Sequence, residues 1–293
     1  MAERLFENEF LEKLEYLYLV SKKILSGQQR AERRSRKTGS GIEFADYREY
    51  MPGDDIRHID WNLYARLQKL FLRLFEEEED LYVYLLLDTS PSMRMGSASC
   101  LDYGLRVAAA LAYITLSNLD RVSVITFGEH LEGRLPPSRG KSNIFKILKF
   151  LEKIPHTQGT QLEDSLQAFV HQTKRRGVVV VISDFFDPQG YTQALKVLRY
   201  FRYDTFAIQL FDETFFDLKA RGDVELFDVE TGETLSSTLS PGLIRAYRQA
   251  FEAYCQELEL FCKKSEISLF RTSIQVPFEE LVLDIFRQGG FLA

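Results

Sequence analysis

The sequence predicts an α/β protein with a doubly wound, mostly parallel sheet, an N-terminal extension and a small β-hairpin insertion. From residue 81 onward, short apolar runs alternate with longer segments of helical periodicity, as in proteins whose strands are joined by helices. Val178–Ile182 is a run of five β-branched residues, which is typical of a strand buried on both faces. Residues 1–79 lack this alternation, so we expect them to form the extension and residues 80–293 to form the α/β domain.

The expected elements follow from the spacing of apolar residues, which differs between strands and helices. Strands are expected at Tyr82–Leu87, Val122–Phe127, Val178–Ile182, Thr205–Leu210 and Ile267–Arg271. Helices are expected at Cys100–Asn118, Ile144–Ile154, Leu162–Lys174, Tyr191–Phe201, Pro241–Lys263 and Phe278–Arg287. The turn Glu230-Thr231-Gly232 indicates a hairpin over Val224–Thr234, within an insertion near residues 211–240.

The N-terminal extension combines a helical stripe with a basic segment. Its apolar residues recur at helical spacing: Phe6, Phe10, Leu14, Leu17 and Ile24. Ser21–Lys37 then holds seven basic residues against one acidic residue. This segment is either a solvated surface or an electrostatic docking arm for an acidic partner.

Composition excludes several classes of protein. The chain has 293 residues, is 45% hydrophobic and carries a net charge of −6, which argues against disorder and against a dedicated nucleic-acid binder. Its three cysteines, Cys100, Cys255 and Cys262, have no metal-type spacing and suit a reducing compartment. No apolar run is long enough to span a bilayer and no signal peptide opens the sequence, so we expect a soluble, cytoplasmic protein.

Oxygen-bearing side chains follow the predicted buried strands. Asp88, Ser90 and Ser92 come after the first strand, Asp184 follows Val178–Ile182, and Thr160 precedes a helix. In open α/β sheets, ligands bind beyond the carboxyl ends of the strands, and such oxygens suit a hard cation such as Mg²⁺. Because this set contains few carboxylates, a bound ion would keep the capacity to accept a carboxylate from another molecule.

Local structural roles compete with this interpretation. Asp88 and Ser90 are also suited to capping the next helix, and Thr160 to capping the helix at Leu162. Asp187 is more typical of an N-cap, because Pro188 follows it at a position that favours proline. In the segment Gly41–Trp61, we expect Asp54, Asp55 and Asp60 to pair with Arg48 and Arg57 in an ionic network rather than to perform catalysis. Such a network would be partly buried.

The pattern Asp88-x-Ser90-x-Ser92, with Gly159-Thr160 and Ser183-Asp184 later, resembles the metal-ion-dependent adhesion site of von Willebrand factor A domains. The chain also resembles the bacterial domain-of-unknown-function 58 family, through Glu43-Phe44-x-x-Tyr47-Arg48-x-Tyr50-x-x-Gly53-Asp54-Asp55-x-Arg57-x-Ile59-Asp60-Trp61 after Gly41. The resemblance implies a von Willebrand factor A fold, a Mg²⁺ site (Mn²⁺ or Ca²⁺ being alternatives) formed by Asp88, Ser90, Ser92, Thr160 and Asp184, and a MoxR-type AAA+ ATPase as partner. The sequence departs from the common Gly-Gly-Thr of such sites by having Gln158-Gly159-Thr160.

Two functions are consistent with these residues. The first is a non-enzymatic, Mg²⁺-dependent module that binds a partner's acidic side chain, with no role for nucleic acid or a membrane span. The second is a Mg²⁺-dependent phosphohydrolase that uses Asp88 as ligand or nucleophile. An aspartyl-nucleophile phosphatase has a second acid two residues further on, where this chain has Ser90, so we favour the first.

Overall fold

The computed structural model describes residues 6–32, 38–39, 43–76, 81–96, 99–154, 159–216, 222–230, 232–288 and 291. These residues form two compact units. The first combines Met1–Leu25 with Leu81–Ala293, and the second is Ser26–Asp80. Among the described residues, no helix has the length and apolarity needed to cross a membrane.

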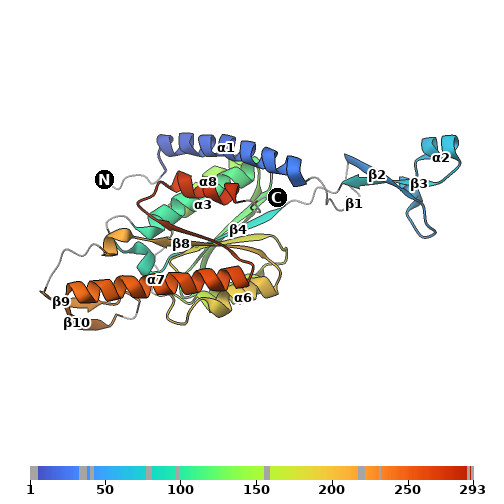
Figure 1. Ribbon diagram of the computed structural model, residues 1–293. Coiled ribbons are helices and arrows are strands. Elements are labelled where there is room, and N and C mark those ends of the chain that lie inside the picture. Colours follow the sequence, from blue (N-terminus) through green and yellow to red (C-terminus); the bar gives the residue numbers. More distant parts are fainter. Residues whose placement is uncertain are drawn as a thin grey trace. The chain divides into compact units, whose positions relative to one another are not determined.

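The first unit is built on a six-stranded sheet (Figure 1). Its strands are β4 (Tyr82–Asp88), β5 (Arg121–Phe127), β6 (Leu131–Arg139), β7 (Val178–Ser183), β8 (Asp204–Phe211) and β11 (Ser268–Ser273). They lie in the order β11-β8-β7-β4-β5-β6, and every neighbouring pair is parallel except β5 and β6. The α/β class and the mostly parallel sheet are therefore confirmed.

Helices cover both faces of this sheet, so alternate strand residues enter two separate cores. Val83, Leu85 and Leu87 face one core, whereas Tyr84 and Leu86 face the other. The first core lies under α1 (Asn8–Glu32), α3 (Cys100–Ser117), α4 (Ile144–Leu151) and α8 (Phe278–Arg287). The second lies under α5 (Leu162–Gln172), α6 (Thr192–Tyr200) and α7 (Pro241–Lys264). Figure 1 shows α1, α3 and α8 on one side of the sheet and α6 and α7 on the other.

Helix α1 packs on the α/β unit instead of forming part of a separate extension over residues 1–79. Phe10, Leu14 and Leu17 of the predicted stripe are buried in the first core, and Phe6 and Ile24 pack against it. The boundary expected between residues 79 and 80 is therefore corrected: the second unit begins at Ser26, after this stripe. The physical reason is that an isolated amphipathic helix has no other surface against which to bury its apolar face.

Strand β6, which lies at one edge of the sheet, was not predicted from the sequence. It contains Pro136 and Pro137, which lack the N–H group needed for a continuous ladder and argue against a strand in sequence terms. The β5–β6 register shifts between Val122 and Val124, next to these prolines, so the pairing continues around them. An edge position tolerates this interruption because one side of the strand needs no partner.

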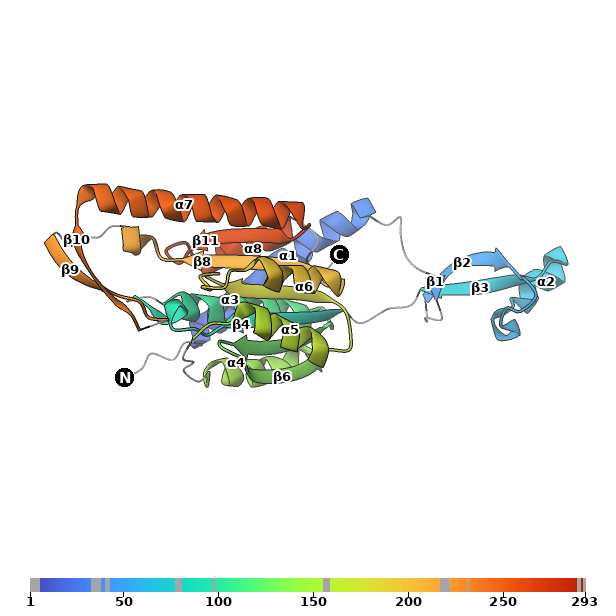
Figure 2. The ribbon, with the colours of Figure 1, turned by 90° about the horizontal axis from the view of Figure 1, so that it is seen from below.

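The predicted hairpin is present as β9 (Gly222–Phe227) and β10 (Thr234–Leu239), which pair antiparallel. Figure 2 shows it as a two-stranded arm separate from the main sheet, beside one end of α7. Most of its side chains are exposed, and Leu239 is its one buried hydrophobic residue among those described. The hairpin is thus held mainly by its own ladder and by contacts at its ends.

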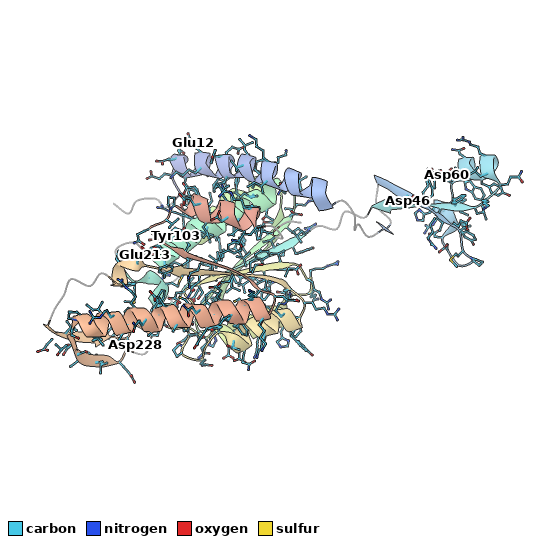
Figure 3. All side chains as sticks on the ribbon, in the orientation of Figure 1. Glu12, Asp46, Asp60, Tyr103, Glu213 and Asp228 are labelled. Atoms are coloured by element: carbon cyan, nitrogen blue, oxygen red, sulfur yellow. The ribbon has the colours of Figure 1, made fainter. Side chains whose placement is uncertain are left out.

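The second unit is a small antiparallel sheet with a short helix. Its strands β1 (Thr38–Gly39), β2 (Glu43–Glu49) and β3 (Phe71–Glu76) lie in the order β1-β3-β2, and α2 (Trp61–Leu67) connects β2 to β3. Asp60, labelled in Figure 3, caps α2 by accepting hydrogen bonds from the Asn62 and Leu63 amides at 2.9 and 3.0 Å. Strands were not predicted in this unit.

The ionic network expected in the segment Gly41–Trp61 is present only in part. Arg48 pairs with Asp54 at 2.8 Å and Arg57 pairs with Asp55 at 2.6 Å. Asp60 instead lies 3.2 Å from Arg73, outside the segment. The first two pairs are solvent-exposed and contribute little stability, since water screens their attraction. Of the basic segment Ser21–Lys37, residues 33–37 lie outside the described residues.

Candidate functional site

Asp88 lies at the centre of the candidate site. It is the last residue of β4 and is fully buried. Its Oδ1 accepts a hydrogen bond from the Ser90 amide at 3.0 Å, and its Oδ2 accepts one from the Ser183 hydroxyl at 2.5 Å. Because β4 and β7 are parallel neighbours, their carboxyl ends meet at one edge of the sheet and bring Asp88 next to Ser183.

The two predicted serine ligands lie together in the loop after β4. The Ser90 and Ser92 hydroxyl oxygens are 3.1 Å apart. The capping alternative for Asp88 and Ser90 is wrong, because Ser99 caps α3 by accepting a hydrogen bond from the Asp102 amide at 2.9 Å. The loop therefore presents its oxygens at the sheet edge without using them to begin a long helix.

Asp184 follows β7 and is only 6% exposed. Its Oδ1 accepts a hydrogen bond from the Phe186 amide at 3.0 Å, and the neighbouring Ser92 side chain favours its ionised form. Burial, followed by the nearby charge of Asp88, raises the pKa of Asp184 well above its usual range. Burial likewise raises the pKa of Asp88. Two buried carboxylates are thus placed where neither ionises readily without a positive charge nearby.

Thr160 lies in the loop that leads into α5. Its hydroxyl oxygen is buried and has no hydrogen-bond partner, and the N-cap residue of α5 is Gln161, whose own side chain makes no capping bond. The capping alternative for Thr160 is therefore wrong. The loop is fixed at the sheet edge because the Gln161 amide donates to the Gly128 carbonyl, directly after β5, at 3.0 Å. Thr160 thus has an unused oxygen at the same edge as the other predicted ligands.

Asp187 connects two loops of the site. Its Oδ2 accepts a hydrogen bond from the Leu162 amide at 2.6 Å, and its Oδ1 accepts one from the Gln189 amide at 2.7 Å. It therefore caps α5, whereas the sequence predicted a cap on the helix after Pro188. This bond ties the loop containing Thr160 to the loop containing Asp184.

Two contributors to the site were not among the predicted ligands. Ser183 was noted only as the neighbour of Asp184, although it bonds Asp88. Glu230, at the turn of the β9–β10 hairpin, accepts a hydrogen bond from the Ser92 amide at 3.0 Å through Oε1, whereas its Oε2 is buried without a partner. The sequence contains no signal for this contact, because Glu230 and Ser92 are 138 positions apart.

The candidate ligands combine carboxylate and hydroxyl oxygens, so they differ from a metal site formed by carboxylates alone. Among the described residues, no group of three or more His, Cys, Asp and Glu side chains is arranged to hold a metal ion. The candidate ligands are instead two aspartates and three hydroxyls. A cavity of about 130 Å³ adjoins Ser92 and Asp184, and its remaining lining is mainly apolar, including Met95, Phe186 and Phe251.

Comparisons with solved structures give low overall similarity. An aerotolerance-related membrane protein from Bacteroides fragilis superimposes with a TM-score of 0.47 at 18% identity, covering 71% of this chain and 100% of that chain. The conserved hypothetical protein BatB from Bacteroides thetaiotaomicron gives a TM-score of 0.46 at 16% identity, with the same coverage of 71% and 100%. The pilus adhesin SpaC from Lactobacillus rhamnosus GG gives 0.44 at 12% identity, covering 73% of this chain and 30% of that chain.

Sequence comparisons give longer matches. An uncharacterized protein of Mycobacterium tuberculosis is 27% identical over 245 residues, which cover 82% of this chain and 77% of that protein. A shorter match to an uncharacterized protein of Mycobacterium avium is 29% identical over 123 residues, covering 41% of this chain and 72% of that protein. The family described as "Protein of unknown function DUF58" matches residues 46–258, a range that includes Tyr47–Trp61 of the second unit and all the candidate ligands. The chain therefore belongs to the DUF58 family.

Proposed function

We propose that this chain is a non-enzymatic protein-interaction module whose binding depends on Mg²⁺, with Mn²⁺ or Ca²⁺ as alternative ions. Asp88, Ser90, Ser92, Thr160 and Asp184 would hold the ion, directly or through water. When bound, the ion supplies a Lewis-acidic centre that accepts a carboxylate from a partner. The observation that carries the proposal is the pairing of two buried aspartates with an unpartnered Thr160 hydroxyl at one sheet edge.

The electrostatics of the two aspartates favour a cation. Burial raises the pKa of Asp88 and of Asp184, and each ionised carboxylate disfavours the other. A divalent ion between them would reverse this effect by stabilising the charged forms. The three hydroxyls add no charge, so the complex of a divalent ion with two aspartates has a net charge of zero. The ion in such a complex keeps an affinity for one more carboxylate.

The resemblance to von Willebrand factor A domains points to a protein partner with an exposed acidic side chain. Membership of the domain-of-unknown-function 58 family points to an AAA+ ATPase of the MoxR type. We propose this partner and a cytoplasmic location. In this arrangement the ATPase performs the chemical work, and the chain described here acts as an adaptor. The absence of a carboxylate at Ser90 makes this function preferable to a phosphohydrolase.

The test is a thermal melt with Mg²⁺ and with EDTA, for wild type, Asp88→Asn and Asp164→Ala. Asp164 is an exposed carboxylate in the first turn of α5 and serves as the control. Saturating Mg²⁺ should stabilise wild type and Asp164→Ala by about 2.7 kcal/mol at a hundred times Kd, because only the folded state binds the ion. The stability of Asp88→Asn should hardly change when Mg²⁺ is added. An equal gain in Asp88→Asn would place the ion elsewhere.

The enzymatic alternative is tested with the same proteins. Wild type should not hydrolyse p-nitrophenyl phosphate in the presence of Mg²⁺ or Mn²⁺. Turnover that disappears in Asp88→Asn and persists in Asp164→Ala would favour the phosphohydrolase instead.

A further inference from the structure

We propose that Glu230 is an intramolecular ligand of the adhesion site, and that a partner's carboxylate must displace it. This inference rests on the proposed function. It assigns a regulatory role to the β9–β10 hairpin, which the proposed function leaves without one. The hairpin would bring to the site, from within the same chain, the chemical group that the partner is expected to bring from outside.

The geometry of the hairpin turn directs Glu230 to the site. The Glu230 amide donates to Asp228 Oδ1 at 2.8 Å, and the Gly232 amide donates to the Asp228 carbonyl at 2.9 Å, so the turn is closed by its own hydrogen bonds. From this turn, Glu230 Oε1 accepts the 3.0 Å hydrogen bond from the Ser92 amide. Ser92 is itself a candidate ligand, so the hairpin contacts the metal loop directly.

The second oxygen of Glu230 is the independent observation that points to a ligand. Glu230 Oε2 is buried yet has no hydrogen-bond partner, which is costly for a carboxylate oxygen. Glu230 is also close enough for its charge to disfavour ionisation of both Asp88 and Asp184. A third carboxylate beside two buried aspartates is an unfavourable arrangement by itself, and a divalent cation bound at the two aspartates would make it favourable.

The hairpin is suited to being displaced. Most of its residues are exposed, and it contributes one buried hydrophobic residue, Leu239, among those described. Little apolar burial therefore holds it in place, and such elements open at low free-energy cost. None of the five candidate ligands belongs to the hairpin, so displacement of Glu230 would leave all five in place.

This arrangement makes Glu230 a competitor of any external carboxylate. Because it is attached to the same chain, its effective concentration at the site is high, and a partner must offer more than one carboxylate contact to replace it. Isolated acidic side chains would then be rejected, and the site would respond to a partner that also binds another surface. Glu230 would occupy the site in the free protein, and binding of the partner would displace it.

The test uses hydrogen–deuterium exchange of the full chain with Mg²⁺ and with EDTA. In wild type, Mg²⁺ should slow amide exchange in the hairpin, Gly222–Leu239. The effect should be lost in Glu230→Ala and in Glu230→Gln, which can still accept the Ser92 hydrogen bond. It should persist in Glu225→Ala, an exposed carboxylate on the same hairpin. Equal slowing in Glu230→Ala and wild type, or no slowing in wild type that binds Mg²⁺, would overturn the proposal.

A second measurement tests displacement with acetate as the carboxylate probe. Saturation-transfer NMR should show Mg²⁺-dependent acetate binding that is several-fold stronger in Glu230→Ala than in wild type or Glu225→Ala. No gain in Glu230→Ala would overturn the competition. Failure of the proposed function is distinguishable from both results, because wild type would then bind no Mg²⁺ at the site or Asp88→Asn would bind it equally well.

Discussion

At the scale of single residues, Asp88 and Asp184 make the protein sensitive to pH. Each is buried, and burial raises the pKa of each carboxyl group in the folded state. In the unfolded chain both return to the ordinary aspartate value of about 4. Between that value and neutral pH, the folded state therefore binds more protons than the unfolded state.

This difference predicts that the metal-free protein loses stability as pH rises. Because the unfolded state binds fewer protons, the free energy of unfolding falls from pH ~5 towards pH ~8. Asp184→Asn should flatten the dependence, since the amide carries no charge. Urea unfolding in EDTA across this range measures it. The stabilisation by Mg²⁺ should increase with pH, because the ion binds the deprotonated aspartates. A stabilisation that decreases with pH would contradict the assigned ligands.

At the scale of elements, α1 shows that a helix distant in sequence is part of the α/β core. Leu14 is fully buried against this core, whereas Leu19 on the same helix is 53% exposed. The helix is also joined to its neighbours at its surface, by Lys13 with Glu279 at 3.1 Å and Lys141 with Glu15 at 2.7 Å. The exposed ion pairs contribute little, so apolar burial provides most of the docking energy.

The pair of leucines gives a matched prediction. Leu14→Ala should destabilise the protein by about 2–5 kcal/mol, because it removes buried methyl groups and leaves a cavity. Leu19→Ala should change the free energy of unfolding by less than about 0.5 kcal/mol, as is usual for exposed positions. Chemical denaturation of both variants measures the difference. Equal effects would show that α1 does not dock through its apolar stripe.

At the scale of the whole molecule, the two units predict different consequences of deletion. All five candidate ligands and Glu230 lie in the unit formed by Met1–Leu25 and Leu81–Ala293. Replacing residues 26–80 by a short Gly-Ser linker should therefore preserve stabilisation by Mg²⁺. Deleting residues 1–80 should lower the melting temperature, because the core then loses Phe10, Leu14 and Leu17. Loss of the Mg²⁺ effect in the first deletion would assign the second unit a part in the site.

Local sequence patterns were sufficient for most of the α/β unit. Val178–Ile182 is β7, and the predicted hairpin and the helix at Pro241 are present, since strand and helix periodicity is a local property. Cys255 and Cys262, which have no metal-type spacing in the sequence, are both buried and free. The sequence patterns failed to predict strands where the position of a segment in the sheet matters more than the strand propensity of its residues. Strand β6 forms despite two prolines because it lies at an edge, and β2 and β3 lack a strong apolar alternation.

The sequence by itself determined the chemistry of the site: which strands end in oxygen-bearing loops, and that two aspartates and three hydroxyls follow them. Tertiary structure alone decided which of these oxygens are already used. Ser183 bonds Asp88, Asp187 caps α5, Thr160 has no partner and Glu230 reaches Ser92. The physical reason is that periodicity depends on neighbours along the chain, whereas these contacts depend on the path of the backbone between residues as many as 138 positions apart.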